Sequence, residues 1–318
     1  MSNDCPCCLP PWAFQFERTE IGWFYSTYGG TIIARFDLKT GARLAELYTL
    51  SGQCDDIVVD LDGNIYFGDQ NTIVALTIDG AVRWTADTGA FIRGLAVTKD
   101  GFIYSAGNSP NIVHKYATAD GSEITSGGWP YTPTIGLLGN VCVDQSGNVY
   151  ICGGPDVSNN HVESMNSSGS QRWLASAGLS SDQGRWCAVN EAGTEVAIAT
   201  ATGIGFGNGQ GVRVAASSGA LQAVYTHVAA QMWGCCYTSS GDAMFIGYAN
   251  GSDYTVVKNS TPYKKVGANF AIVAGSDGAE ICGWPLNRID GSNAWGPGDF
   301  GGYGLEHWQG RIGALGRR

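Results

Sequence analysis

Cysteine is the residue type in this chain whose spacing most directly suggests chemistry. Cys5, Cys7 and Cys8 lie together in the segment CPCC, beside two further prolines. Three thiolates could hold a metal ion, but the sequence offers no apparent fourth ligand for a zinc site. We therefore interpret residues 1–11 as an N-terminal arm whose thiols, together with Cys54 in a predicted loop, could form crosslinks.

Other short motifs match catalytic or metal-binding patterns only in part. The segment DLDGN at Asp60–Asn64 resembles the start of a calcium loop, but the twelfth position, which needs a bidentate glutamate, is Asn71. His161 and Glu163 have the H-x-E spacing of zinc deaminases without the later P-C-x-x-C. The glycine-rich stretch at residues 202–211 lacks the spacing of a phosphate-binding loop. We therefore predict no catalytic residue, no metal site and no cofactor.

Charge and hydropathy argue against two classes of function. The chain has 18 Lys and Arg against 28 Asp and Glu, a net charge of −10 that does not suit a nucleic-acid binder. No apolar run approaches the roughly 20 residues of a membrane-spanning helix. The N-terminus has neither the basic region nor the apolar stretch of a Sec signal peptide, so classical secretion is not expected.

A four-strand pattern repeats along the chain and must position any functional residue. In its clearest copy, Ile57–Trp84, apolar strands are separated by Asp62-Gly63 and Asp79-Gly80, and Asp-Gly is a strong hairpin signal. A first-turn glycine recurs at intervals of 37 to 48 residues, at Gly22, Gly63, Gly101, Gly147, Gly193, Gly241 and Gly278. Four strands per copy at this period are typical of β-propeller blades. The sequence therefore predicts an all-β fold, a seven-bladed β-propeller of four-stranded blades.

The two ends of the chain leave an alternative open. The first and last copies are the most degenerate, so a six-bladed propeller in which Phe270–Gly283 completes the sheet of Thr31–Tyr48 is the second possibility. The predicted propeller spans residues 12–295, with Phe14–Glu17 as the inner strand of its first copy. Gly296–Arg318 is rich in glycine and shows no strand pattern, so we interpret it as a C-terminal tail.

Three segments resemble known propeller repeats. ALTIDGAVRW at Ala75–Trp84, SMNSSGSQRW at Ser164–Trp173 and ARFDLKTGARL at Ala34–Leu44 look like the PQQ-like and WD40-like repeats. In the PQQ-like group a turn glycine is followed by a tryptophan that docks between blades. The resemblance implies that Trp84 and Trp173 are buried between blades, and it implies a fold without a specific activity.

The same resemblance suggests an enzymatic alternative. PQQ-dependent dehydrogenases place a vicinal disulfide against their quinone, and Cys235-Cys236 is a vicinal pair. Those enzymes are much longer, and they need a catalytic aspartate and a calcium site for which this sequence offers no candidate. We favour the interpretation that Cys235 and Cys236 face opposite sides of one strand.

The remaining blade cysteines are expected to stay reduced. Cys142, Cys187 and either Cys235 or Cys236 occupy nearly matched places on successive blades. Stacked sheets lie about 10 Å apart, which is too far for a disulfide except where the blades converge at the axis. A two-residue hairpin turn would pair Cys142 with Ile151 and would put Cys142 and Cys152 on opposite faces of the sheet.

The propeller fold also indicates where a ligand would bind. In propellers, the loops that enter the inner strands surround the mouth of the axial channel. Charged, polar and aromatic residues of the kind that form binding hot spots occur in these predicted loops. The candidate binding residues are Asp55, Asp56, Arg93, Asn140, Arg185, Trp186 and Trp233.

Two classes of function fit these observations. The first is a non-catalytic structural or interaction propeller that binds other protein subunits, because the sequence lacks a catalytic constellation. Its composition and the absence of a signal peptide favour a virion component, such as a tail, fibre or decoration protein, with a cytoplasmic location as the alternative. The second is a propeller enzyme, either a quinone-dependent oxidoreductase or a lyase or hydrolase, acting at the channel mouth.

Overall fold

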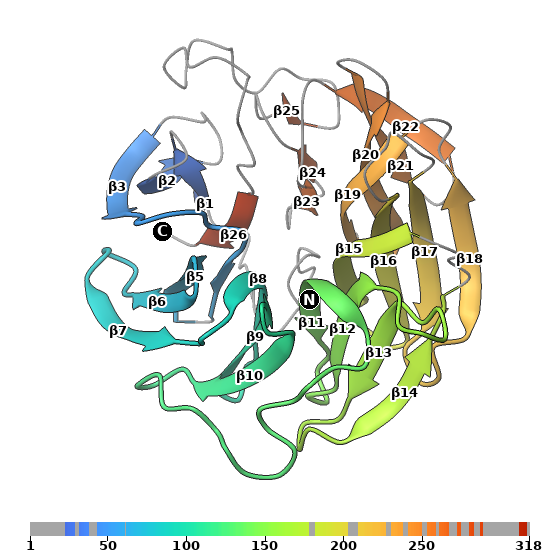
Figure 1. Cartoon of the computed structure of the whole chain (residues 1–318). Helices are drawn as coiled ribbons and strands as arrows, with labels where there is room; N and C mark the ends of the chain where they lie inside the picture. Colours follow the sequence, from blue (N-terminus) through green and yellow to red (C-terminus); the bar gives the residue numbers. More distant parts are fainter. Residues whose placement is uncertain are drawn as a thin grey trace.

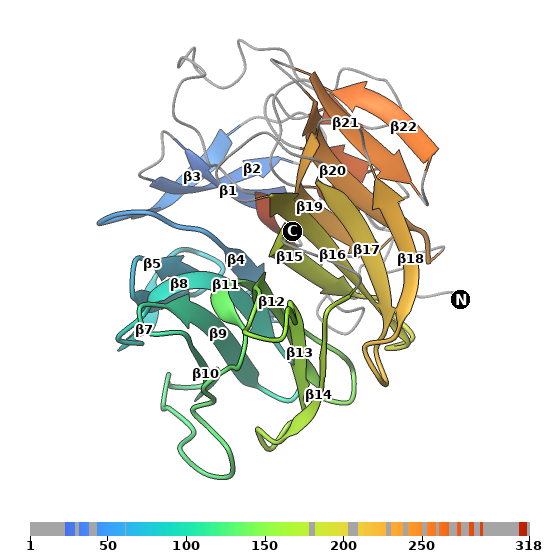
Figure 2. The ribbon, with the colours of Figure 1, turned by 45° about the vertical axis from the view of Figure 1, so that its right-hand side comes forward.

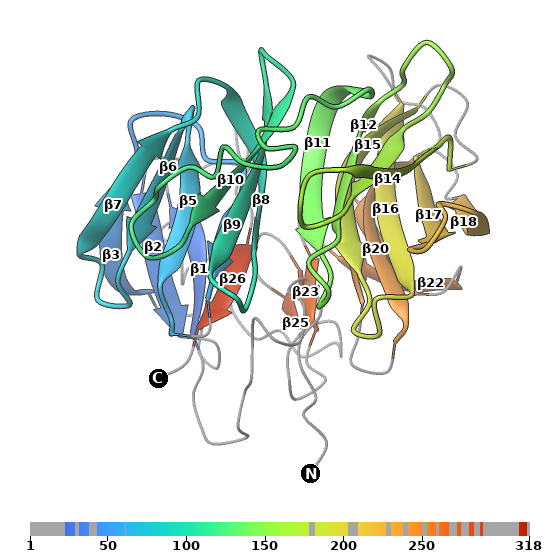
Figure 3. The ribbon, with the colours of Figure 1, turned by 90° about the horizontal axis from the view of Figure 1, so that it is seen from below.

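The chain folds into antiparallel sheets arranged around an axis, seen along that axis in Figure 1 and from the side in Figure 3. The computed structural model describes residues 23–28, 32–37, 43–60, 62–177, 182–202, 209–226, 230–237, 241–249, 253–258, 261–266, 272–274, 280–282, 287–288 and 312–316. Within these ranges every regular element is a β-strand and none is a helix. The predicted all-β propeller architecture is confirmed.

The described strands form seven sheets, five with four strands and two with three. Written with the innermost strand first, the sheets are β26 (Ile312–Gly316), β1 (Trp23–Tyr28), β2 (Ile32–Asp37) and β3 (Arg43–Thr49); β4 (Ile57–Val59), β5 (Ile65–Asp69), β6 (Thr72–Leu76) and β7 (Val82–Asp87); β8 (Phe91–Val97), β9 (Phe102–Asn108) and β10 (Ile112–Ala117); β11 (Gly136–Val143), β12 (Val149–Gly154), β13 (Val162–Met165) and β14 (Gln171–Ala175); β15 (Asp182–Val189), β16 (Glu195–Thr202), β17 (Gln210–Ala215) and β18 (Leu221–Thr226); β19 (Ala230–Tyr237), β20 (Ala243–Ala249), β21 (Asp253–Lys258) and β22 (Thr261–Val266); and β23 (Ile272–Ala274), β24 (Glu280–Cys282) and β25 (Asn287–Arg288).

The innermost strands form a closed ring. In the order β26, β4, β8, β11, β15, β19 and β23 each strand lies beside the next, and β23 lies beside β26. Figure 2 shows the sheets that begin with β11, β15 and β19 stacked face to face along part of this ring. Because every inner strand is packed on both faces, its apolar residues run almost continuously, as in Ile57–Val59.

The ring is closed by a segment that the sequence pattern did not identify. No strand was expected within Gly296–Arg318, yet Ile312–Gly316 forms β26 and pairs antiparallel with β1. The alternative closure is not found, since β23 and β24 pair with each other and β24 pairs with β25. The predicted arm at residues 1–11 and the predicted inner strand at Phe14–Glu17 lie outside the described residues.

The first hairpin is built on the predicted glycine in five copies, whereas Gly22 and Gly278 lie outside the described residues. Gly63, Gly101, Gly147, Gly193 and Gly241 have φ values between 64° and 86°, a region that favours glycine. Their placement in the turns between first and second strands confirms the repeat and its register along the chain.

The first hairpin loops are longer than predicted, and this changes one pairing. The Asp144 carboxylate accepts hydrogen bonds from the backbone of Ser146 and Asn148 at 2.9 Å each, which holds a five-residue loop in place of a two-residue turn. Cys142 therefore pairs with Tyr150, and the predicted partner Ile151 pairs with Val141. In this register Cys142 and Cys152 share one face of the sheet, contrary to the prediction.

The two tryptophans singled out by the repeat dock between sheets. Trp84 is 8 % exposed, and its indole N–H donates to Thr118 O at 2.9 Å in the next sheet. Trp173 is half-buried and donates to Ala216 O at 3.0 Å in the same manner. Glycine provides the room, because a Cβ on Gly121 would lie 2.6 Å from the Trp84 ring. The docking predicted for both residues is confirmed.

One predicted blade lacks its fourth strand. The sheet β8–β10 is followed by an irregular segment, residues 118–135, which meets β10 through isolated bridges at Val113–Tyr131 and Tyr116–Glu123. Glu163 on β13 is fully buried and fixes this segment. Its carboxylate accepts hydrogen bonds from Tyr131 Oη and from the backbone N–H of Thr134 at 2.9 Å.

Candidate functional site

The predicted binding residues occupy two adjacent structural positions, seven and eight residues before the first-turn glycine of each copy. Four inner strands carry a β-bulge near their start, between Ile92 and Gly94, Gly136 and Asn140, Gly184 and Trp186, and Met232 and Gly234. A bulge leaves its extra residue outside the ladder and re-aims the side chain. In each of these copies one residue lies eight positions before the first-turn glycine, and in the four bulged strands this residue is part of the bulge. In successive copies it is Asp55, Arg93, Gly139, Arg185 and Trp233.

These residues were predicted to lie in loops, and most of them do not. Arg93 lies in β8, Asn140 in β11, Arg185 and Trp186 in β15, and Trp233 in β19. The inner strands start earlier than their apolar runs suggested, because each bulge carries polar or glycine residues that precede the apolar run. We call Asp55, Asp56, Arg93, Asn140, Arg185 and Trp186 the axial rim; the side chain of Trp233 lies outside the described residues.

Asp56 is the hub of the axial rim. Its carboxylate is 3 % exposed and accepts hydrogen bonds from Ile57 N at 3.0 Å, Leu95 N at 2.9 Å and Asn140 Nδ2 at 3.1 Å. These donors belong to three successive sheets. Asp56 and Asn140 lie in sheets that are not neighbours, so their contact places both side chains close to the axis.

Arg93 is held in one orientation beside this hub. Its guanidinium Nη1 lies 2.7 Å from Oδ2 of Asp55, which is buried and also accepts from Gln53 Nε2 at 2.7 Å. The Arg93 guanidinium carbon lies 4.7 Å from the centre of the Phe91 ring, a cation–π distance. The Arg93 side chain is still 39 % exposed, so a pre-oriented cation faces solvent at the rim.

Close approach of backbones brings the rim residues of neighbouring sheets together. A Cβ on Gly139 would lie 2.2 Å from Gly184 O and 2.9 Å from the Cα of Arg185. A Cβ on Gly94 would lie 2.8 Å from the Cα of Asn140. Glycine at these two positions is therefore required for β8, β11 and β15 to meet at the rim.

The cysteines of the described residues are buried thiols. Cys54 is 6 % exposed and donates to Asp56 O at 3.5 Å, so it lies in the core and is not open to a crosslinking partner. Burial raises the pKa of the Cys152 and Cys187 thiols well above the usual value, which keeps them protonated and poorly nucleophilic. Cys5, Cys7 and Cys8 lie outside the described residues.

The vicinal pair does not form a disulfide. Cys235 pairs with Phe245 and Cys236 pairs with Met244, so the two side chains face opposite sides of β19, as predicted. Both cysteines are fully buried and neither is in a disulfide, and Cys235 Sγ donates to Ala197 O at 3.4 Å.

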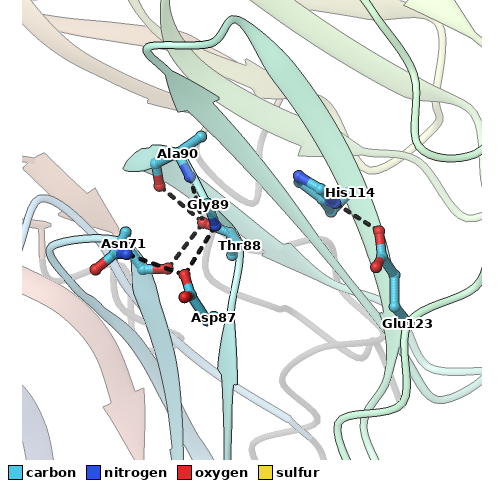
Figure 4. Close-up of polar contacts among 7 residues, drawn as sticks. All are labelled: Asn71, Asp87, Thr88, Gly89, Ala90, His114 and Glu123. Atoms are coloured by element: carbon cyan, nitrogen blue, oxygen red, sulfur yellow. Dashed lines mark hydrogen bonds and ion pairs between the residues drawn. The ribbon is translucent and has the colours of Figure 1, made fainter.

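A second polar cluster lies where the chain passes from β7 to β8 (Figure 4). Asn71 Nδ2 donates to Asp87 Oδ1 at 2.9 Å, and the Thr88 hydroxyl donates to Ala90 O at 2.7 Å. His114 Nδ1 lies 2.6 Å from Glu123 Oε1 across the irregular segment. The first two contacts order the connection from β7 to β8, and the third orders the irregular segment after β10. None of them joins a histidine to a nucleophilic side chain.

The calcium-like segment is a structural turn. Asp60 accepts hydrogen bonds from Asp62 N, Asn64 N and Tyr66 Oη, which occupies its oxygens. In the part of the chain that the structure describes, no group of three or more His, Cys, Asp or Glu side chains is placed to hold a metal ion. Over the same residues, no helix has the length and apolar character needed to cross a membrane.

Comparison with known proteins finds similarity only at the level of structure. No protein-family model and no curated protein matches the chain. The β-propeller domain of Cps50 (Swd1) from Myceliophteria thermophila is 10 % identical, with a TM-score of 0.64 over 85 % of this chain and 95 % of that one. A Bacteroides caccae protein of unknown function is 14 % identical, with a TM-score of 0.53 over 79 % and 94 %.

A third similar structure is larger than this chain. The extracellular domain of the putative hybrid two-component system BT4673 from B. thetaiotaomicron is 12 % identical, with a TM-score of 0.52 over 84 % of this chain. This chain covers 38 % of that structure. At such identities the likeness shows the fold alone: the chain has the architecture of a β-propeller, similar to the WD40 type.

Proposed function

We propose that this propeller is a non-catalytic interaction module that binds other protein chains through the axial rim. The observation that carries the proposal is the shared bulge, which presents Arg93 and Arg185 at the same position of two inner strands. Asp56 and Asn140 hold the backbone beneath them, and a rigid scaffold that carries a few oriented charged and aromatic side chains suits recognition. The buried thiols and the Asp60 turn serve packing and leave the rim as the functional surface.

The finer form of the proposal is a structural component of a virion, such as a tail, fibre or decoration protein. Its support is compositional: 47 glycines, 11 % aromatic residues and only 14 % charged residues suit a stable all-β assembly subunit. In that setting the partners are other protein subunits of the particle, and the chain works in the virion rather than in the cytoplasm.

A matched pair of arginine substitutions tests the proposal. Arg93 and Arg43 both have side chains that are 39 % exposed, and both pair with an acidic residue, but Arg43 lies on the outermost strand β3. Arg93→Gln combined with Arg185→Gln should prevent incorporation of the chain into particles purified from its source, whereas Arg43→Gln should not. Thermal unfolding of each variant separates loss of binding from loss of fold.

Either of two results would contradict the proposal. Incorporation that is unaffected by the rim double variant, while its melting temperature equals that of the wild type, would show that the rim is not the binding surface. Substrate turnover that disappears with the rim arginines in a folded protein would favour an enzyme.

A further inference from the structure

Strand β18, on the outer perimeter of the molecule in Figure 1, differs in composition from the other outermost strands. Each of the five four-stranded sheets ends in a fourth strand, and no further strand pairs with it in the part of the chain that the structure describes. Four of these strands contain charged residues or proline, namely Arg43 and Glu46 in β3, Arg83 and Asp87 in β7, Arg172 in β14, and Pro262, Lys264 and Lys265 in β22. The fifth, β18, has the sequence LQAVYT and contains neither. Charged residues and proline on an exposed edge hinder pairing with another chain, so β18 is the edge that lacks this protection.

The two exposed apolar residues of β18 lie next to each other on one face of the sheet. Leu221 pairs with Val214 and Val224 pairs with Val212, with a bulge between the two pairs. Because residues 212 and 214 point to the same face, their partners on β18 do so as well. Leu221 is 47 % exposed and Val224 is 39 % exposed, whereas Val212 and Val214 are fully buried. The apolar interior therefore continues without a break to the outer edge of this sheet.

The other fourth strands hold different residues at these two positions. The same register gives Arg43 and Glu46 in β3, Val82 and Thr85 in β7, Gln171 and Leu174 in β14, and Pro262 and Lys265 in β22. Each of these pairs includes a polar or charged residue. Of the five fourth strands, β18 alone is aliphatic at both positions.

The opposite face of β18 anchors the strand to the next sheet. Tyr225 is 6 % exposed, and its ring centre lies 5.4 Å from that of Phe245 on β20. The charged residues of β16 and β17 are Glu195 and Arg213, and Arg213 Nη1 lies 3.1 Å from Glu195 Oε2. The Arg213 guanidinium carbon also lies 5.7 Å from the Tyr225 ring centre. These two charges therefore pair with each other on the face that Leu221 and Val224 do not share.

The preceding sheet supports the start of β18. A Cβ on Gly219, in the turn before β18, would lie 2.7 Å from the Trp173 ring on β14, so the turn packs directly on that ring. Arg172, the charged residue of β14, donates to Tyr150 Oη at 3.1 Å and to Ser164 Oγ at 3.0 Å. Its guanidinium is thus bound to its own sheet, and β18 is an uncharged edge held in place on both sides.

From this edge we propose that β18 pairs antiparallel with β18 of a second copy of this chain, around a two-fold axis at Val224. The axis places Val224 opposite its counterpart and Ala223 opposite Tyr225 of the second copy, with no like charges facing each other. The equivalent pairing of β3 would set Glu46 against Glu46. A net charge of −10 opposes contact between two copies in general, so an uncharged edge is where they meet at the least cost. The interface would be isologous, which is the commonest form in homo-oligomers.

Sedimentation equilibrium of the full chain tests the pairing, in a reducing buffer that prevents crosslinks between thiols. The wild type should form a dimer with a dissociation constant below about 100 µM. Raising the salt concentration should tighten this dimer, because salt screens the repulsion between two chains of net charge −10 and the edge contains no ion pair to weaken. A chain that stays monomeric at about 100 µM would overturn the inference.

A matched pair of lysine substitutions identifies the edge. Val224→Lys places two cations opposite each other across the two-fold axis and should raise the dissociation constant at least about tenfold. Thr85→Lys is the control, because Thr85 is exposed at the equivalent position of β7 and should leave the dimer unchanged. A folded Val224→Lys variant that dimerises like the wild type would show that β18 is not the interface.

Crosslinking tests the register and does not require the fold to accept a lysine. In Val224→Cys the two thiols face each other, so oxidised glutathione should produce a dimer whose disulfide joins the two substituted positions, located by peptide mapping. Thr85→Cys should give no such link. A folded Val224→Cys variant without the link would overturn the two-fold pairing. The variant that combines Arg93→Gln with Arg185→Gln should dimerise like the wild type, so this interface and the axial rim are tested independently.

Discussion

The sheet β4–β7 and the sheet β8–β10 fill the same place between neighbours with different chain segments. In the first, the ring of Trp84 on the fourth strand is tilted against that of Tyr66 with centroids 5.7 Å apart, and its N–H donates to Thr118 O. In the second there is no fourth strand, yet the ring of Trp129 in the irregular segment is tilted against that of Tyr104 with centroids 5.2 Å apart, and its N–H donates to Ser167 O at 3.0 Å.

The acceptor is equivalent in both sheets. Thr118 and Ser167 each follow the third strand of the next sheet within two residues, as does Ala216, the acceptor for Trp173. The space between two stacked sheets is thus filled by a tryptophan ring whose indole N–H reaches the backbone carbonyl that follows the third strand of the next sheet. The backbone that delivers the ring can be a strand or an irregular segment, provided that another group holds the segment.

The most severe test of this equivalence is removal of each ring. Trp84→Ala and Trp129→Ala should each lower the free energy of unfolding by about 3–5 kcal/mol, because both rings are at least 92 % buried and each leaves a cavity and an unpaired carbonyl. Chemical denaturation measures both values. A cost for Trp129 below about 1 kcal/mol would show that the two docks are not equivalent.

Glu163 fixes the irregular segment and also accepts a hydrogen bond from Gln171 Nε2 on β14 at 2.7 Å. Glu163→Ala leaves the N–H groups of Thr134 and Ile135 without their acceptor and should cost about 3 kcal/mol. Glu163→Gln keeps one oxygen and should cost less. Glu195→Ala provides the comparison, since Glu195 pairs with Arg213 at 27 % side-chain exposure and should cost about 1 kcal/mol or less. Equal costs for Glu163→Ala and Glu195→Ala would contradict the assigned role.

The buried tyrosines should make both sheets sensitive to alkali. Burial raises the pKa of Tyr66 and of Tyr131 above the usual value of about 10, and the neighbouring carboxylates of Asp60 and Glu163 add to the rise. As pH rises, the unfolded chain therefore loses the tyrosine hydroxyl protons before the folded chain does. The contribution of these tyrosines to the free energy of unfolding is fully present below a pH of about 10 and decreases as pH rises further. Tyr66→Phe and Tyr131→Phe should each flatten this decline, measured as melting temperature against pH.

The smallest expected effect concerns the polar support that Tyr66 receives. Its hydroxyl donates to Asp60 and accepts from Arg83 at 2.9 Å, and Tyr150 makes the corresponding contacts with Asp144 and Arg172. At neutral pH Tyr66→Phe should cost about 1 kcal/mol by denaturant unfolding. A stabilised variant would show that these hydrogen bonds add nothing to the dock.

The sequence predicted the architecture because its signals are local. Asp-Gly turns at a regular period, apolar strands, and the tryptophans at Trp84 and Trp173 depend on a few adjacent residues. Trp129 was missed because residues 118–135 are not a strand. Trp84 and Trp173 follow the glycine of their second turn by four residues, whereas Trp129 follows Gly121 by eight. What fixes that segment is Glu163, more than 25 residues away, and a pairwise contact of this kind leaves no periodic signal.

In the candidate site, too, features with a local sequence signal could be predicted and long-range contacts could not. Asp55, Arg93 and Arg185 could be chosen from sequence because propeller geometry places the start of each inner strand near the axis. Their assignment to loops was wrong for Arg93 and Arg185, since these polar residues lie in bulges that precede the apolar runs of β8 and β15. The Asp56–Asn140 hydrogen bond joins residues 84 positions apart and could not be read from either segment.

That hydrogen bond has a consequence for how the molecule opens. Proteins built from repeats usually come apart in steps, because each repeat contacts only its neighbours. Asp56 instead couples the sheet of β4 to the sheet of β11 across the one between them, and its third donor is the amide of Leu95 in that middle sheet. Amides in these three sheets should therefore exchange with solvent as one cooperative unit, with the Leu95 amide among the slowest in the chain.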